Sequence, residues 1–242
     1  MLATAVATPL HAVPAPTTAP HRQRPRADSL AEHLSPCAIR TFDGKEHLCR
    51  EGDAVTHVYK VEIGHDCLYR MLADGRRQVV NFAYPGDFIG LGAIAEHQAS
   101  ALATTRTSVR CLPITALRDL MRSDAAVGLK LYEALSRELQ AARDLLFTVS
   151  QRTASERVAG FLLALSRRNA RRGGRADEIV LPMTRADIAD FLGLTIETVS
   201  RTFTKFRHGG LIDLEQCILV TVTDSDGLSA AAGEVVGDRH GR

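Results

Sequence analysis

Glu197, Ser200 and Arg201 are the side chains of this sequence whose types and spacing best fit a recognition chemistry. They recur at i, i+3 and i+4, so they share one face of the helix that the periodicity predicts over residues 195–207. Arginine can bond the O6 and N7 atoms of guanine, glutamate can accept from cytosine N4, and serine can bond several bases. The trio could therefore read one G·C base pair from both strands. The alternative is an i,i+4 ion pair on a solvated helix face.

The residues around this trio predict a helix-turn-helix. A short first helix is expected over residues 184–191, because Thr184 can cap it and Asp187 can complete a capping box. Gly193 supplies the backbone freedom for a tight turn, and Thr195 can cap the second helix. Such a pair is typical of DNA-binding proteins, although it also occurs in proteins that bind no DNA. Polar side chains near the two helices are expected to contact phosphates and set the register: Thr184, Arg185, Thr195, Thr198 and Lys205.

The charge balance requires a local binding surface. The net charge is only +2, so affinity for nucleic acid must come from a patch and not from the whole surface. Basic residues are concentrated in the C-terminal half and flank the predicted reading helix. They are therefore expected to form this patch. The chain has no tryptophan and only 5% aromatic residues, which argues against a stacking platform for single strands.

A chain of 242 residues is long enough for two modest domains joined by a helix. No apolar run approaches the roughly 20 residues that cross a bilayer, and the N-terminus lacks the features of a secretory signal. A cytoplasmic protein without membrane contact is therefore expected. The predicted divisions are a disordered Ala-, Pro- and Thr-rich tail (1–27), a β-roll (28–122), a long helix (123–150), a winged helix-turn-helix (151–228) and a flexible C-terminal tail (229–242). A capping box at Thr153 and Glu156 is expected to begin the first helix after residue 150.

The roll is predicted from short strands that alternate with turn residues. Strands are expected at 58–63, 67–72, 78–83 and 108–112, with turns at Asp74-Gly75 and at 84–87. Regularly spaced strands of this length favour a small antiparallel barrel or roll, which can hold a small ligand.

The long helix carries an apolar seam at near-heptad spacing. This seam is long enough to pair with a second copy of itself, which predicts a homodimer. The alternative is a helix lying on its own roll. The seam consists of Val127, Leu131, Leu135, Leu139, Ala142, Leu146 and Val149.

Metal and redox chemistry find little support in the residue pattern. The five cysteines have no CxxC spacing, so no zinc finger or iron–sulfur loop is indicated and no cofactor is expected. Cys217, predicted near DNA in the wing, could respond to oxidation, or it could be an inert packed thiol. A cupin-like metalloenzyme is the alternative from another class, with His47, His57, Glu62, His65 and His97 as candidate ligands. No HxH pair occurs and the spacing does not place ligands on one strand face, so a non-enzyme is expected.

The order of these parts resembles that of the Crp/Fnr superfamily of bacterial transcription regulators, and most closely its FNR and FixK branch. The resemblance spans roughly residues 38–232 and is carried by PGDFIG in the roll, the long helix, ERVAGFLL, and LPMTRADIADFLGLTIETVSR. It implies an α+β fold with an N-terminal antiparallel β-roll of the cyclic-nucleotide-binding type, a dimerisation helix and a C-terminal winged helix-turn-helix. It also implies a homodimer that binds double-stranded DNA at TTGAT-type palindromes. Glu197 and Arg201 would contact the G·C pair and Ser200 a thymine, and RNA polymerase would be recruited to genes of low-oxygen or denitrifying metabolism.

At three places this sequence differs from the pattern of particular branches of the superfamily. Ile196 stands where cyclic-nucleotide-responsive members carry an arginine that reads a second guanine, a contact that isoleucine cannot make. Residues 90–100 lack the arginine that holds the phosphate of cyclic AMP, so no cyclic nucleotide is expected. Cys111 matches one cysteine of the FNR cluster, but only Cys37 precedes it, so no cluster is implied. A cyclic-nucleotide- or small-ligand-gated regulator is the nearer alternative.

Overall fold

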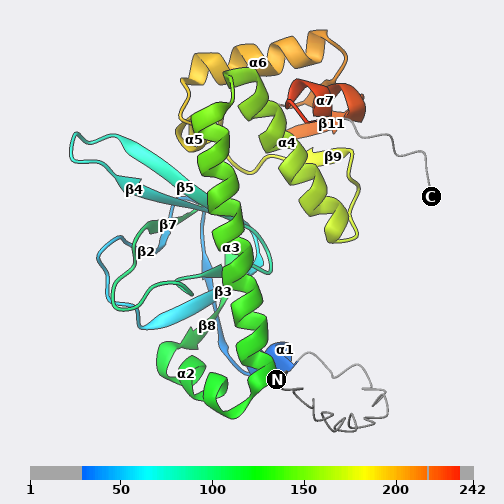
Figure 1. The fold of residues 1–242 in the computed structure, drawn as a ribbon. Coiled ribbons are helices and arrows are strands. Elements are labelled where there is room, and N and C mark those ends of the chain that lie inside the picture. Colours follow the sequence, from blue (N-terminus) through cyan, green and yellow to red (C-terminus); the bar gives the residue numbers. More distant parts are fainter. Residues whose placement is uncertain (1–28, 217, 235–242) are drawn as a thin grey trace, which may run out of the picture.

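Two four-stranded antiparallel sheets form the N-terminal roll in the computed structural model, which describes residues 29–216 and 218–234 (Figure 1). One sheet has the order β1-β8-β3-β6 and the other β2-β7-β4-β5. The strands are β1 (Ala38–Phe42), β2 (His47–Cys49), β3 (His57–Ile63), β4 (Asp66–Met71), β5 (Arg77–Ala83), β6 (Phe88–Ile89), β7 (Ser100–Ala103) and β8 (Thr107–Pro113).

The predicted strands correspond to β3, β4, β5 and β8. Strands β4 and β5 form a hairpin whose turn contains Gly75 at φ 84°, a left-handed conformation that glycine adopts without strain. The sequence missed β1, β2, β6 and β7, because β2, β6 and β7 are short and β1 is exposed along most of its length. The roll is therefore confirmed, with twice as many strands as the alternation indicated.

Three helices accompany the roll: α1 (Ser29–Leu34), α2 (Ile114–Ser123) and the long α3 (Ala125–Gln151). The first two turns of α3 lie against the roll, where Val127 and Leu131 are 0% and 1% exposed in a core shared with Val58 and Leu112. Farther along α3, large apolar side chains are exposed in the protomer, including Leu139 at 52%. The prediction that Val127 and Leu131 belong to a dimer seam is therefore wrong, because these two side chains fill the protomer's own core.

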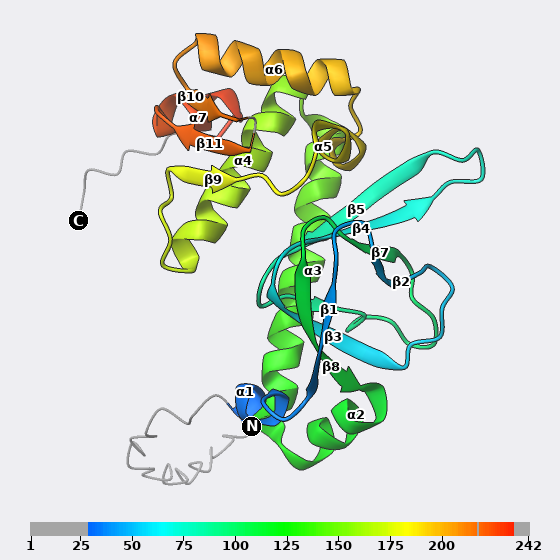
Figure 2. The ribbon, with the colours of Figure 1, turned by 180° about the vertical axis from the view of Figure 1, so that it is seen from behind.

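In the described part of the chain, the C-terminal domain consists of four helices and a small sheet (Figure 2). The elements are α4 (Ala154–Arg171), β9 (Glu178–Val180), α5 (Arg185–Leu192), α6 (Ile196–His208), β10 (Ile212–Glu215), β11 (Leu219–Val222) and α7 (Ser225–Ala231). The sheet has the order β10-β11-β9, in which β10 and β11 form the wing that follows α6 and β9 adds a third strand from before α5. Cys217, the predicted redox residue, lies outside the described residues.

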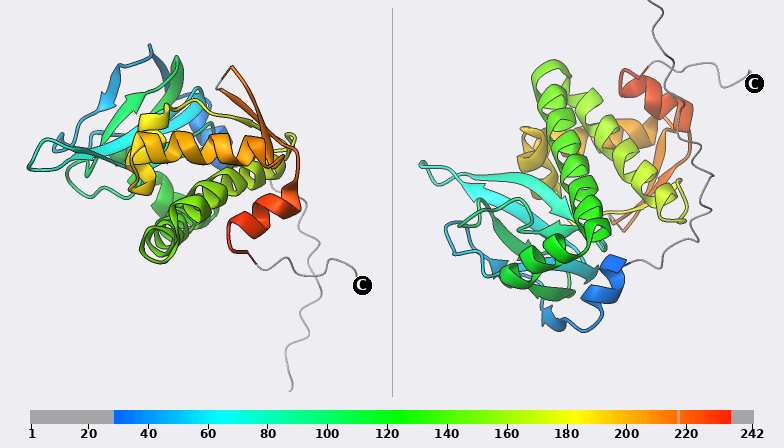
Figure 3. Two further views of the ribbon diagram at one scale, coloured as in Figure 1. Left: turned by 90° about the horizontal axis from the view of Figure 1, so that it is seen from above. Right: turned by 60° about the horizontal axis from the view of Figure 1, so that its bottom comes forward.

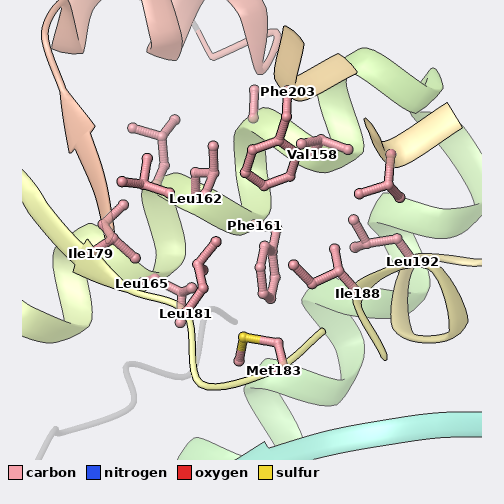
Figure 4. Close-up of a cluster of buried hydrophobic side chains, with 14 of the residues drawn as sticks. Val158, Phe161, Leu162, Leu165, Ile179, Leu181, Met183, Ile188, Leu192 and Phe203 are labelled. Carbon is pink, nitrogen blue, oxygen red and sulfur yellow. The ribbon is translucent and has the colours of Figure 1, made fainter. Parts of the chain in front are cut away.

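The core of this domain joins α4, α5, α6 and β9 (Figure 4). Val158, Phe161 and Leu162 of α4 meet Ile188 of α5 and Phe203 of α6 in the same buried cluster. Both predicted capping boxes are present, at Thr153 with Glu156 and at Thr184 with Asp187. Burying one large apolar side chain contributes about 1.5–3 kcal/mol, so this cluster is the main anchor of the helices that it joins.

The C-terminal boundary differs from the prediction. Helix α7 continues past residue 228, and Leu228 and Ala232 are fully buried in the core beneath α4. The predicted start of a flexible tail at residue 229 is therefore wrong, because these apolar side chains close the core. The predicted tail at 1–27 and the residues after 234 lie outside the described ranges. No helix within those ranges is long and apolar enough to cross a membrane.

Asp66 places a carboxyl group in the apolar interior of the roll. Its side chain is fully buried, it pairs in the sheet with Ala83 and Ala103, and neither carboxylate oxygen has a hydrogen-bond partner among the described residues. Burial raises the pKa of Asp66 from 3.8 to about 7. At a pH between these two pKa values, the Asp66 carboxyl is therefore protonated in the folded state and ionised in the unfolded chain.

Asp66→Val tests this assignment through the pH dependence of stability. Because the folded pKa lies above the unfolded one, the wild-type free energy of unfolding should fall as the pH rises from about 4 to about 7, by at most about 4 kcal/mol. The Asp66→Val variant should lack this component, and urea denaturation at several pH values measures it. Asp119→Val, at an exposed helix position, is the control for the same substitution outside the roll's interior. Equal slopes in the wild type and Asp66→Val would show that Asp66 does not titrate in this range.

Candidate nucleic-acid interface

Helix α6 has one buried and one exposed face. Val199, Phe203 and Phe206 are buried in the core of the C-terminal domain, as their spacing predicted. The opposite face carries Glu197, Ser200 and Arg201, which are all exposed. Seen from above, α6 lies on the outer surface of the domain, away from the roll (Figures 1 and 3). The structure thus brings the predicted trio together on one accessible surface.

The start of α6 is fixed by its cap. The Thr195 hydroxyl accepts from the Thr198 backbone N–H at 3.2 Å, so both residues are engaged at the helix N-terminus. The pKa of Glu197 is lowered by its own backbone N–H first and then by the Thr195 hydroxyl, with Arg201 the smallest contributor. Both the Glu197 carboxylate and the Arg201 guanidinium belong to exposed residues, so both are accessible from the same surface.

The basic residues of the C-terminal half divide into two groups. Arg167, Arg168 and Arg175 form ion pairs with Glu234, Asp87 and Asp177, so their charges are engaged away from α6. Lys205 and Arg207, by contrast, are exposed on α6 itself. The predicted patch is therefore smaller than the sequence indicated, because carboxylates take up part of it, and two of them, Glu234 and Asp87, are distant in sequence.

Helix α5 supplies the remaining predicted phosphate contacts. Thr184 is exposed at the N-cap of α5. The Arg185 guanidinium lies over the Phe203 ring, with Cζ 3.6 Å from the ring centroid. Arg185 therefore ties α5 to α6 through a cation–π contact, in addition to any contact with a phosphate.

Arg157 is a structural residue of this site that the sequence did not reveal. Its Nε donates to the carbonyl of Arg152 at 2.9 Å, and its Nη1 donates to the carbonyls of Leu192 at 3.0 Å and Gly193 at 3.5 Å. Gly193 ends α5 in a left-handed conformation, at φ 64°. A cation at this helix C-terminus is favourable because the last carbonyls carry partial negative charge. One guanidinium thus joins the α3–α4 connection to the turn of the helix-turn-helix.

The second half of α3 presents an apolar stripe. Leu135, Leu139 and Leu146 are 37%, 52% and 67% exposed, and Ala142 is exposed between them. Val149, the last residue of the predicted seam, is half-buried. A stripe of this kind on a single helix is costly in water, so it is a candidate surface for a second copy of the chain.

A cavity of about 420 Å³ lies between the roll, α3 and α5. Its lining is mainly apolar, with Leu68, Ile89, Leu145 and Phe191, and includes Glu138 and Arg70. Arg70 is ion-paired with Glu51 at 2.8 Å. The phosphate of a cyclic nucleotide would need a cation here, and Arg70, the one arginine of this lining, is engaged by Glu51.

The candidate metal ligands of the roll are dispersed among other contacts. His47 Nε2 hydrogen-bonds the Tyr69 hydroxyl at 2.8 Å, and Glu62 bonds Arg110 at 3.1 Å. Within the described ranges, no group of three or more His, Cys, Asp or Glu residues could hold a metal ion. Cys111 is a buried strand residue, and burial raises the pKa of its thiol.

Comparison with known proteins places these features in a family context. The family model for the Crp-like helix-turn-helix domain matches residues 156–231, and that for the cyclic nucleotide-binding domain matches residues 39–124. The chain is 42% identical over 171 residues to the nitrogen fixation regulation protein FixK of Bradyrhizobium diazoefficiens, which covers 70% of this chain and 72% of that protein. It is 34% identical over 203 residues to FixK of Rhizobium meliloti, covering 81% and 91%. The structure of FixK2 from Bradyrhizobium japonicum superposes with a TM-score of 0.76 at 32% identity, covering 83% of this chain and 98% of that one.

Arg157→Met tests the clamp at the turn. Methionine keeps the aliphatic packing but removes three N–H donors, so the free energy of unfolding should fall by about 2–3 kcal/mol in urea denaturation. Arg175→Met removes exposed surface ion pairs with Asp177 and Glu178 and should cost much less. A loss at Arg157 as small as the loss at Arg175 would contradict the clamp.

Proposed function

The chain belongs to the Crp/Fnr family of transcription regulators and carries the family's helix-turn-helix DNA-binding domain, and from this premise we propose that it is a FixK-like activator. One observation carries the proposal: α6 is anchored by Val199, Phe203 and Phe206 while Glu197, Ser200 and Arg201 stand exposed on its other face. Base-reading residues in the first two turns of such a helix reach the edges of bases in the major groove.

The proposed reading unit is a homodimer on a TTGAT-type palindrome. Arg201 donates to the guanine, Glu197 accepts from the paired cytosine, and Ser200 lies near a thymine. Thr184, Arg185, Thr195, Thr198 and Lys205 contact phosphates and set the register. The exposed part of the α3 stripe joins two protomers, which places their reading helices about 34 Å apart, one turn of DNA. The chain divides accordingly into a roll, a dimerisation helix and a reading domain, with boundaries near residues 123 and 151.

The proposed activity depends on the amount of protein and not on a cyclic nucleotide. The cavity beneath α3 supports this part of the proposal, because Arg70, the one arginine of its lining, is engaged by Glu51. The relatives include nitrogen fixation regulators and a fumarate and nitrate reduction regulatory protein. By analogy with those names, the proposed targets are genes of low-oxygen or denitrifying metabolism, activated through RNA polymerase.

Selection from random DNA duplexes tests the proposal as a whole. The purified full-length chain should enrich two inverted TTGAT-type half-sites at a single spacing, since a symmetric dimer imposes its two-fold axis on the site. An enriched pool without a common motif would refute sequence recognition. Enrichment of isolated half-sites would refute the dimeric mode alone.

Arg201→Ala and Lys205→Ala should have different effects on binding. Loss of Arg201 should remove about 1–3 kcal/mol of discrimination at the guanine position, measured as affinity for matched and G·C-to-A·T duplexes. Loss of Lys205 should weaken binding to both duplexes by the same factor and reduce the salt dependence by about one charge. If Arg201→Ala keeps its preference for guanine, Arg201 does not read that base.

Leu139→Glu should dissociate the dimer. A charge at the centre of the α3 stripe cannot be buried without a partner, so the dimer dissociation constant should rise at least about tenfold in sedimentation equilibrium. The protomer should remain folded, because Leu139 is already exposed in it. Ile94→Glu, at an 87% exposed position in the roll, is the matched control and should leave the dimer intact. A wild-type protein that sediments as a monomer would contradict the proposed interface.

A further inference from the structure

The roll contacts the reading domain through a fork of charged hydrogen bonds. Arg77, the first residue of β5, donates through Nη2 to the carboxylates of Asp187 and Asp190, and through Nε to Asp190 at 3.1 Å. The neighbouring Gln78 donates from Nε2 to the backbone carbonyl of Asp190. Both aspartates belong to α5, and β5 lies beside α5 from both sides of the molecule (Figures 1 and 2). The β4–β5 hairpin therefore holds the first helix of the helix-turn-helix.

The fork is partly shielded from water. The side chain of Asp187 is 10% exposed and those of Arg77 and Asp190 about 30%, at 28% and 32%. Burial alone would raise the pKa of Asp187, but hydrogen bonds from Thr184 and the Arg77 guanidinium hold it below its ordinary value. The same carboxylate therefore closes the capping box of α5 and accepts from the roll. Arg77 thus contacts the residue that fixes the start of α5.

An apolar joint lies next to the fork. The rings of Phe82 from β5, Phe161 from α4 and Phe191 from α5 contact one another, with centroids 5.2–6.3 Å apart. This apolar joint holds the two parts together. The Arg77 guanidinium donates to two carboxylates of α5 at once, which restricts its geometry. Together with the Arg168–Asp87 ion pair between α4 and the roll, the Arg77 fork therefore fixes the angle between the two parts.

The fork leaves the reading surface free. Glu197, Ser200 and Arg201 are exposed on α6, while the partners of Arg77 lie on α5. The orientation that Arg77 holds is therefore compatible with docking of α6 on DNA. Contacts besides the chain connection are needed because α4 follows α3 after the two extended residues Arg152 and Thr153, about which the domain could otherwise pivot.

We infer that Arg77 is a positioning residue that sets the spacing between half-sites. The inference rests on the proposed function, in which a dimer reads two half-sites. Adding one base pair moves a half-site by about 3.4 Å and rotates it by roughly 35°. A reading domain fixed to the roll, and through α3 to the dimer axis, cannot follow that change. A domain that pivots on Arg152 and Thr153 can follow it in part.

Equilibrium binding to duplexes of different spacing tests the inference with the full-length chain. The duplexes carry the two selected half-sites at the best spacing, at one base pair more and at one fewer, and a fourth duplex carries a single half-site. Wild type should prefer the best spacing at least about tenfold. Arg77→Ala should reduce that preference about fivefold while leaving the base preference on the single half-site unchanged.

Three further variants separate positioning from stability. Arg77→Lys keeps a point charge but not the fork, so it should recover part of the spacing preference. Asp190→Asn leaves the capping carboxylate of Asp187 in place. As a single variant it should lower the spacing preference, and in the double variant with Arg77→Ala it should cause little further loss. The single Asp190→Asn variant keeps the inference testable if Arg77→Ala fails to fold. Arg76→Ala, whose partner Asp74 lies in the same exposed turn, should behave as wild type.

The possible outcomes distinguish the inference from the function on which it rests. If the wild type shows the expected base and spacing preferences and both Arg77→Ala and Asp190→Asn keep the same spacing preference, the inference is overturned but the proposed function stands. Tighter binding of Arg77→Ala to every duplex would also overturn it, because the fork would then oppose DNA binding. A wild type without base preference would remove the proposed function and the inference together.

Discussion

Sequence reading by α6 requires a helix that is fixed along one face and bare along the other. Val199, Phe203 and Phe206 meet the first condition, since they are buried among residues of α4 and α5. Each buried ring contributes about 1.5–3 kcal/mol, enough to hold the helix in a single orientation against loss of side-chain freedom. The exposed trio can then be aimed at base edges without reorganisation on binding, which is the condition for geometric selectivity.

The anchor of α6 extends through the rest of the molecule by a few directional contacts. Arg185 joins α5 to α6, Arg157 joins the turn after α5 to the residues that follow α3, and Arg77 joins α5 to the roll. Apolar contacts among Phe82, Phe161 and Phe191 fill the space between. Three arginines thus connect elements that are distant in sequence, because a guanidinium can bond several oxygens at fixed angles. The position of the reading helix relative to α3 depends on these contacts.

The sequence predicted the parts of this arrangement that depend on local chemistry. Capping boxes at Thr153 and Thr184, the turn at Gly193 and the two faces of α6 all follow from residues within one or two helical turns. Features that depend on distant partners were missed. Nothing near Val127 shows that α1 and the roll cover it, nothing near Arg168 indicates Asp87, and nothing near Arg77 indicates α5. The base-reading roles themselves stay predictions, because side-chain exposure shows access and not recognition.

The central claim is that Glu197, Ser200 and Arg201 read sequence from the exposed face of α6. Its most direct test is the equilibrium affinity of the purified chain for a TTGAT-type palindrome and for a scrambled duplex of the same length and composition, at one physiological salt concentration. Fixing the salt holds the phosphate contribution constant, so the ratio reports base recognition. The account predicts that the palindrome is bound at least about 10³-fold more tightly. Equal affinities for the two duplexes would contradict it.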